Sequence, residues 1–356
     1  MEAKERALIH LAHWMQTTGK TDVAREAATT QLADYFEEYE GAQPLEKTVW
    51  ARNFLDVAHQ RSGLFVEYDT GSCLSHKNFL EYLAATALVD KSDEDMRQTV
   101  LVHAADPSWE EVIRLAFAHE KLPRSRYKLL LDGLLAAGHV TLAGHCTVDA
   151  GARLSLPLRR EVQMRLYDQM VDSTLPPKQR FLAAEALDES GWLPPDVHEW
   201  VRCPGCAQGR RDLYVAKYPV TNAQFALFME AGGYENEAYW QDGKNKGDGW
   251  RWRIKEYPDY RGQEAVTEPR YWHDARFGRE RHGCPVVGVS WYEAAAYAAW
   301  LSDLLRRGRD VEGSLSEAEM ALVADLLASG AQLVRLPQDE EWVRVAGNAH
   351  DKRFLG

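Results

Sequence analysis

Cys203 and Cys206 are the only closely spaced pair of cysteines in the sequence, with two residues between them. Two thiolates at this spacing can bind a soft metal or cycle between dithiol and disulfide. A zinc site would need a second pair, and the remaining cysteines, Cys73, Cys146 and Cys284, are scattered along the chain. We therefore favour a structural loop at 203–206 and keep Cys203 and Cys206 only as weak candidate metal ligands.

A second group of chemically active side chains lies near the middle of the chain. His139 and His145 are close in sequence to Cys146. Their spacing fits no common zinc pattern, so we assign no metal site there. Residues 91–195 offer no other combination of side chains that is typical of a catalytic site.

A third group combines arginines with aromatic side chains in the C-terminal part. The arginines are Arg251, Arg253, Arg276, Arg279 and Arg281, and the aromatic residues among them are Trp250, Trp252, Tyr271, Trp272 and Phe277. Such a surface could stack on nucleic-acid bases. The whole chain has a net charge of −12, however, which disfavours a general nucleic-acid binder. We therefore expect a solvated surface of cation–π contacts and no nucleic-acid partner.

The first 90 residues are predicted to hold three helices, a β-hairpin and a further helix. Leu8, Leu11, Ala12 and Met15 mark one face of a helix that stops at Gly19. Thr21 could cap a second helix. A third helix follows and ends before Gly63. Alternating residues around the turn at 69–71 then predict a hairpin, and a helix restarts at Ser75. Helices followed by a small wing are typical of a winged-helix unit.

The segment from Arg61 to Ala85 resembles the winged-helix region of NACHT-type signalling ATPases of the STAND class. Their pattern is R-x-G-L, a hairpin, then F-x-H-x-x-F-x-E-Y-L-A-A, and Leu74 replaces the first Phe here. In that family the histidine, which corresponds to His76, reaches the phosphates of ADP on a neighbouring NTPase domain. The resemblance thus implies a nucleotide-sensing role for His76, whereas a capping or buried structural histidine is the alternative. It also implies an upstream NTPase domain, so we expect this sequence to be part of a longer protein.

Residues 91–195 are predicted to form a helical spacer. Helical stretches at 110–118, 127–137, 160–171 and 179–189 carry apolar residues at helical spacing and are separated by prolines or glycines. The segment from Arg180 to Leu187 resembles a helix of a HEAT-like repeat. We expect this part to connect the flanking domains and to transmit force between them.

Residues 196–356 contain three further motifs. Thr221 with Gln224 and Ser290 with Glu293 each have the spacing of a capping box, so each pair predicts the start of a helix. The third motif runs from Val334 to Trp342. There Gln338 occupies the position of the helix cap, where it is a poor capping residue.

Together the three motifs resemble the formylglycine-generating enzyme, or sulfatase-modifying factor, domain. Its consensus is Y-P-V-T-N-x-x-[FY], then P-V-x-x-V-S-W-x-x-A-x-x-[YF]-x-x-W, then R-L-P-T-E-A-E-W. The resemblance implies an α+β fold of the C-type-lectin type, and copper and calcium as cofactors of a complete domain. The family segments that follow the third motif and hold the copper-binding cysteine pair do not follow it here. We therefore expect no cofactor in this chain and an incomplete domain, in which Trp291, Tyr297, Trp300 and Trp342 are less buried than usual.

The sequence thus predicts a multidomain protein with a mainly α N-terminal part (winged helix at 1–90 and HEAT-like spacer at 91–195) and an α+β lectin-like domain at 196–356. Its first predicted function is recognition of a protein or small ligand by the lectin-like domain of a bacterial, cytoplasmic NACHT/STAND-like protein. The alternative is a formylglycine-generating oxidase that acts on a sulfatase cysteine, and a purely structural interaction module is a third. No run of residues has the length and hydrophobicity of a membrane span.

Overall fold

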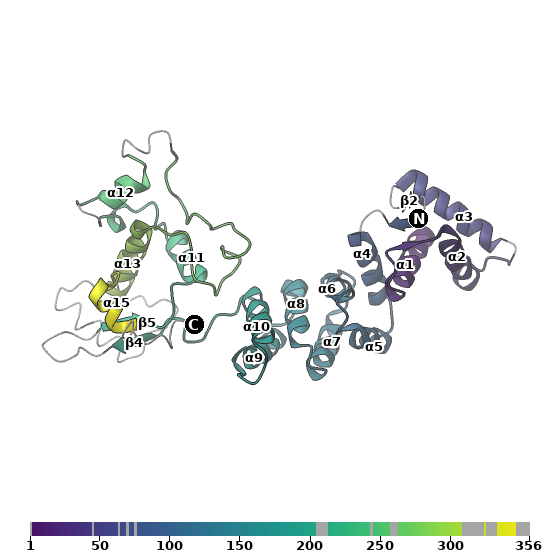
Figure 1. Cartoon of the computed structure of the whole chain (residues 1–356), viewed down its shortest axis with the longest axis horizontal. Coiled ribbons are helices and arrows are strands. Elements are labelled where there is room, and N and C mark those ends of the chain that lie inside the picture. Colours follow the sequence, from purple (N-terminus) through teal and green to yellow (C-terminus); the bar gives the residue numbers. More distant parts are fainter. Residues whose placement is uncertain are drawn as a thin grey trace. The chain divides into compact units, whose positions relative to one another are not determined.

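The computed structural model describes residues 2–44, 46–62, 65–68, 71–74, 77–203, 213–242, 245–256, 263–307, 324 and 333–346. The chain divides into two compact units, Met1–Ser190 and Gly191–Gly356. Most of the first unit is helical, and the described part of the second has few strands (Figure 1). In the described part of the chain, we find no helix that is both long and apolar enough to cross a membrane.

The first unit opens with helices around a small antiparallel sheet. Its elements are α1 (Glu2–Thr17), β1 (Asp22–Val23), α2 (Arg25–Glu40), α3 (Lys47–Val57), the π-helical turn η1 (Ala58–Ser62), β2 (Phe65–Tyr68), β3 (Gly71–Leu74) and α4 (Lys77–Val89). The strand order is β1-β3-β2, with Phe65 opposite Leu74 and Asp22 opposite Cys73. The predicted helices and hairpin are therefore present, with one strand that was not expected.

That extra strand corrects the prediction for the second helix. Thr21 does not cap it, because Asp22 and Val23 pair with β3 and the helix begins only at Arg25, after Ala24. Strand pairing with a segment some 50 residues away cannot be read from local capping residues. By contrast, the first helix ends as expected: Gly19 adopts a left-handed conformation with a φ of 66°.

The rest of the first unit consists of helices in two rows. The helices that follow are α5 (Asp93–His103), α6 (Glu110–Ala118), α7 (Arg124–Ala136), α8 (Val140–Ala150), the 3-10 turn η2 (Gly151–Arg153), α9 (Leu156–Val171) and α10 (Pro177–Glu189). One row contains α4, α6, α8 and α10, and the other contains α5, α7 and α9 (Figure 1). Four of these helices match the predicted stretches, whereas α5 and α8 were missed.

The winged part and the two rows of helices meet at Trp109. This residue lies just before α6 and is 2% exposed. The His103 ring stacks on it with the centroids 4.0 Å apart, and the His13 ring of α1 meets it edge-on at 6.3 Å. The side-chain amide of Gln16 donates to the Ser108 carbonyl at 2.8 Å. These contacts join α1 directly to the start of α6.

The second unit combines short elements with long loops. Its described elements are β4 (Trp200–Cys203), β5 (Leu213–Ala216), α11 (Asn222–Glu230), the 3-10 turn η3 (Glu237–Tyr239), α12 (Asp248–Arg253), α13 (Trp291–Arg306) and α15 (Asp339–Ala346). Strands β4 and β5 form an antiparallel pair. Both predicted capping boxes are confirmed, at Thr221–Gln224 for α11 and at Ser290–Glu293 for α13.

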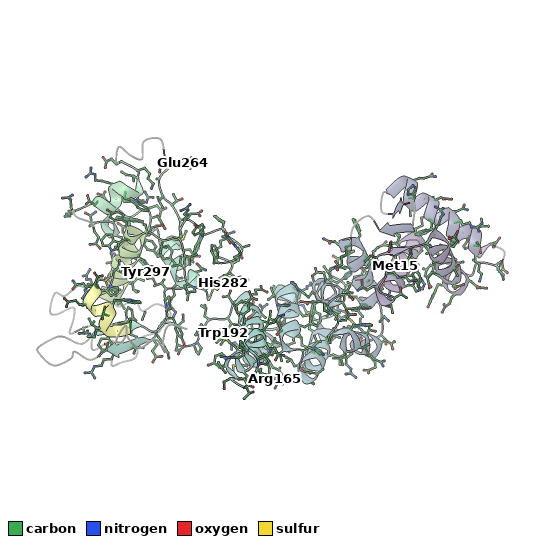
Figure 2. The ribbon with its side chains drawn as sticks, viewed as in Figure 1. Met15, Arg165, Trp192, Glu264, His282 and Tyr297 are labelled. Atoms are coloured by element: carbon green, nitrogen blue, oxygen red, sulfur yellow. The ribbon has the colours of Figure 1, made fainter. Side chains whose placement is uncertain are left out.

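Aromatic side chains form the core of the second unit. The Phe225 and Tyr297 rings stack with centroids 5.5 Å apart, and Phe228 meets Trp300 at 5.7 Å. Figure 2 labels Tyr297 on α13. Tyr297 and Trp300 are buried, at 8% and 4% exposure, whereas Trp291 and Trp342 are exposed at 55% and 58%. The predicted loss of burial relative to a complete domain remains a prediction.

Candidate functional site

A cavity of about 500 Å³, widely open to solvent, lies in the second unit between the C-terminal end of α12 and the N-terminal end of α13. Its volume is within the range of small-molecule sites. The polar side chains on its wall are Lys255, Glu268, Arg270, Ser290 and Glu293, and the aromatic ones are Trp252 and Tyr271.

Both cations on this wall lie over aromatic rings. The Lys255 Nζ is 4.5 Å from the centroid of the Trp252 ring, and the Arg270 guanidinium carbon is 5.3 Å from that of Tyr271. A cation is attracted to the negative face of such a ring, which limits the side chain's freedom. The wall therefore presents positive charge held next to flat apolar surface.

Lys255 reaches the cavity because of the way α12 ends. Its amide donates to the Trp252 carbonyl at 3.1 Å, and the Glu256 amide donates to the Arg251 carbonyl at 2.9 Å. This is the Schellman pattern, whose left-handed position is usually occupied by glycine. Here Lys255 has the left-handed conformation, with a φ of 57°, and it is the one non-glycine residue with positive φ in the described part of the chain. Left-handed backbone at a residue other than glycine is strained, and such strain is common at binding sites.

Gly288 holds the opposite wall close to Arg270 and Tyr271. The Arg270 amide donates to the Gly288 carbonyl at 3.1 Å. Gly288 has a φ of 75°, and a Cβ atom placed on it would lie 2.6 Å from Cδ2 of Tyr271. Only glycine fits this approach without displacing the Tyr271 ring.

The two carboxylates on the wall already have partners. Glu293 is 2% exposed and accepts hydrogen bonds from the Tyr234 hydroxyl at 2.6 Å and from the Ser290 amide at 2.7 Å. Burial and the adjacent Glu293 carboxylate raise the pKa of Tyr234 above its ordinary value, so its hydroxyl remains protonated. The Glu268 carboxylate lies 3.0 Å from Nε2 of His273.

The sequence-based candidates lie elsewhere or outside the described residues. His76 and Cys206 belong to the latter, so their predicted roles remain predictions. Cys203 is partly buried at the end of β4, opposite Leu213. No cluster of three or more His, Cys, Asp or Glu side chains suited to a metal occurs among the residues that the structure describes.

Cys146 and the neighbouring His145 have structural surroundings. Cys146 is fully buried in α8, and burial raises the pKa of its thiol well above the ordinary value. The His145 ring contacts Glu110 of α6 at 3.3 Å and Glu189 of α10 at 4.0 Å. These contacts tie α6, α8 and α10 together.

Most of the arginines that the sequence singled out have acidic partners. Arg276 pairs with Asp274 at 2.9 Å, Arg279 with Glu280 at 3.0 Å and Arg251 with Glu256 at 3.3 Å. Arg253 is buried with its guanidinium carbon 4.8 Å from the centroid of the Trp250 ring, and burial lowers its pKa. The sequence reasoning missed Lys255 and Arg270, the two cations that line the cavity.

Comparison with known families identifies both ends of the chain. Residues 198–355 match the model of the sulfatase-modifying factor enzyme 1-like domain, and residues 1–88 match that of the winged helix-turn-helix domain C-terminal to NACHT. The chain thus joins a NACHT-associated winged helix to a sulfatase-modifying-factor-like domain. This confirms the two resemblances that the sequence motifs indicated.

Similar curated proteins carry unrelated activities in their names. The hercynine oxygenase of Mycolicibacterium thermoresistibile is 33% identical over 93 residues, which cover 24% of this chain and 18% of that protein. The serine/threonine-protein kinase Pkn1 of Chlamydia trachomatis serovar L2 is 34% identical over 125 residues, which cover 35% and 16%. The chain therefore spans less than a fifth of either relative. No solved structure matches it significantly. This similarity supports the domain assignment and does not specify a reaction.

Proposed function

We propose that this chain is a portion of a cytoplasmic NACHT/STAND-like signalling protein, and that its sulfatase-modifying-factor-like domain recognises a ligand in the cavity between α12 and α13. The observation that carries the proposal is the strained Lys255, whose side chain lies over Trp252 on the cavity wall. A glycine would relieve the backbone at that position but would supply neither charge nor reach.

The winged helix supports the signalling part of the proposal. Its family is defined by its position after a NACHT domain, so we expect an NTPase domain upstream in the full-length protein. His76 would then sense the bound nucleotide. The two rows of helices that follow are consistent with a HEAT-like spacer, through which a change at the ligand-binding domain could reach the winged helix by way of Trp109.

The fold assigned to the second unit is part of the proposal as well. Two helices with confirmed capping boxes and an aromatic core agree with an α+β domain of the C-type-lectin type. Binding residues are often found on loops that a rigid scaffold positions. The cavity between the two helix ends is the surface that we assign to recognition.

Ligand-observed NMR on the whole chain tests this function. The probe is a library of aromatic fragments with equal numbers of anionic, neutral and cationic members. Tyr271→Ala, which removes one aromatic wall, should abolish the saturation transfer of most binders. The matched control is Trp291→Ala, which removes an exposed aromatic ring next to Ser290 that does not line the cavity. If the binders respond equally to both substitutions, or if none is found, the cavity is not a recognition site.

The alternative function is oxidation of a sulfatase cysteine to formylglycine, which the family resemblance implies would use copper. Copper(I) prefers thiolates that lie close together. Among the described residues, Cys146 lies in α8, Cys203 in β4 and Cys284 in the loop before α13. Cys206 and the side chain of Cys73 lie outside the described residues, so the described part of the chain offers no thiolate pair for this metal. We therefore derive no oxidative step. Incubation with a C-x-P-x-R peptide and copper, followed by mass spectrometry, would overturn this choice if the cysteine were converted and if Cys203→Ser abolished the conversion.

A further inference from the structure

The cations of the second unit differ in what surrounds them. Arg276 and Arg270 are a matched pair, because each lies over the ring of the residue that follows it, Phe277 at 4.8 Å and Tyr271 at 5.3 Å. Arg276 also binds Asp274 through two of its nitrogens. Arg270 has no carboxylate partner among the described residues and lies on the cavity wall.

Neither carboxylate on the cavity wall forms an ion pair with this cation. Glu293 is almost completely buried and both of its oxygens accept hydrogen bonds. Glu268 is directed to His273. The donors on the cavity wall include the Arg270 guanidinium, which can only donate and cannot accept a hydrogen bond.

Flat apolar surface adjoins these donors. Trp252 and Tyr271 line the same cavity as Arg270 and Lys255, and Tyr271 is 40% exposed. A guanidinium recognises a planar carboxylate with two parallel hydrogen bonds, and aromatic rings contribute contact area to a neighbouring apolar group.

From this juxtaposition we infer that the cavity binds an anion with an attached aromatic or apolar group, with the carboxylate or phosphate at Arg270 and the apolar group against Trp252 and Tyr271. This inference rests on the proposed recognition function and specifies its ligand class. The ligand could be a small aromatic acid or an acidic side chain beside an aromatic residue in a peptide, since both have this chemistry.

Isothermal titration of the whole chain with two pairs of probes tests the inference. The first pair is N-acetylphenylalanine and its neutral amide. The second is a peptide with blocked ends that contains Phe-Asp and its Phe-Asn counterpart. The acidic member of at least one pair should bind at least tenfold more tightly than the neutral member, as expected for a charge-assisted pair with arginine. The pair that shows the difference distinguishes the small acid from the peptide.

Arg270→Gln should remove this preference for the acid, and Arg270→Lys should restore part of it. Arg276→Gln is the matched control and should leave the preference unchanged. A thermal melt of each variant verifies folding, which we expect to be retained because the Arg270 side chain is exposed. Equal binding of acid and amide, no binding of any probe, or equal effects of Arg270→Gln and Arg276→Gln would overturn the inference. The recognition function would still stand without the anion preference if the fragment screen found neutral or cationic fragments whose binding Tyr271→Ala abolishes.

Discussion

The two units achieve their stability with different kinds of residue. The helical unit buries aliphatic side chains between regular elements, as Leu131 and Leu134 of α7 show with no exposed surface. The sulfatase-modifying-factor-like domain uses aromatic rings and loops, and its loops depend on specific polar contacts. The side-chain nitrogen of Asn222 lies within 3.1 Å of the carbonyls of Phe277, Gly278 and Arg281. Loops between short elements leave room for an open cavity, whereas closely packed helices leave little room for one.

The largest effect should come from the aliphatic core of the helical unit. Leu131→Ala removes a fully buried side chain and should lower the free energy of unfolding of this unit by about 3 kcal/mol. Hydrogen exchange, read separately for each unit, measures it. Leu156→Ala is the control, because Leu156 is 67% exposed and its loss should have little effect. Equal losses of protection in both units would mean that they do not unfold separately.

In the sulfatase-modifying-factor-like domain, one added methyl group at a closely packed glycine should reduce the stability nearly as much as the loss of a buried leucine side chain does in the helical unit. Gly278→Ala places a Cβ atom 2.5 Å from the Trp272 carbonyl oxygen and 2.6 Å from that of Asp274. Since backbone atoms cannot move aside easily, we expect a loss of about 2–3 kcal/mol in urea unfolding. Gly247→Ala, where the nearest atom is 4.0 Å away and φ is 83°, should lose only about 1 kcal/mol. A milder effect at Gly278 than at Gly247 would contradict the description of this loop.

Loss of a helix-capping serine should have a smaller effect on stability, and this effect should differ between the two units. Ser290 accepts a hydrogen bond from the Glu293 amide, so Ser290→Ala should destabilise the aromatic domain by about 1 kcal/mol. Ser155 occupies the corresponding position of α9 without a side-chain hydrogen bond. Ser155→Ala should therefore have almost no effect on the thermal midpoint. Similar shifts for the two variants would show that capping is not what Ser290 contributes.

The smallest effect concerns the pH dependence of the helical unit. Burial lowers the pKa values of His13 and His103 below their ordinary 6.5, and nearby Lys91 adds to the effect at both residues. Below about pH 6.5 the unfolded chain then binds more protons than the folded unit. The free energy of unfolding is therefore highest above that pH, where both histidines are neutral, and it decreases as the pH falls. His103→Phe should keep the ring contact with Trp109 and flatten the dependence between pH 7 and 5. An unchanged slope in urea unfolding would contradict this assignment.

The features that could be predicted from the sequence depend on local chemistry. The capping boxes at Thr221 and Ser290 are correct because the interacting groups are three residues apart. At the third helix, the sequence indicated a weak cap at Gln338. The structure shows that the Gln338 amide donates to Glu341 at 2.8 Å, and that the Arg335 ion pair helps to lower the pKa of this carboxyl to about 2.

The features that were missed depend on contacts between distant parts of the chain. Helix α8 contains β-branched residues and Gly144, which are poor helix formers. The helix forms nevertheless, because Gly144 allows close packing, with a Cβ position only 3.0 Å from atoms of Leu166 and Ala186. The cavity was missed for a similar reason: nothing in the sequence near Lys255 indicates a left-handed residue where glycine is usual.

The turn at Lys255 has a consequence for the natural variation of this domain. A Lys255→Gly substitution would remove the backbone strain at this position. We therefore expect other residues, glycine among them, to replace the lysine in related proteins that do not use it for binding. Lineages that retain a long basic residue after a helix corresponding to α12 should also retain an arginine at 270 and a glycine at 288. Related sequences that have all three residues should therefore also have the cavity, and those that lack them should not. This distinction can be made from the sequences alone.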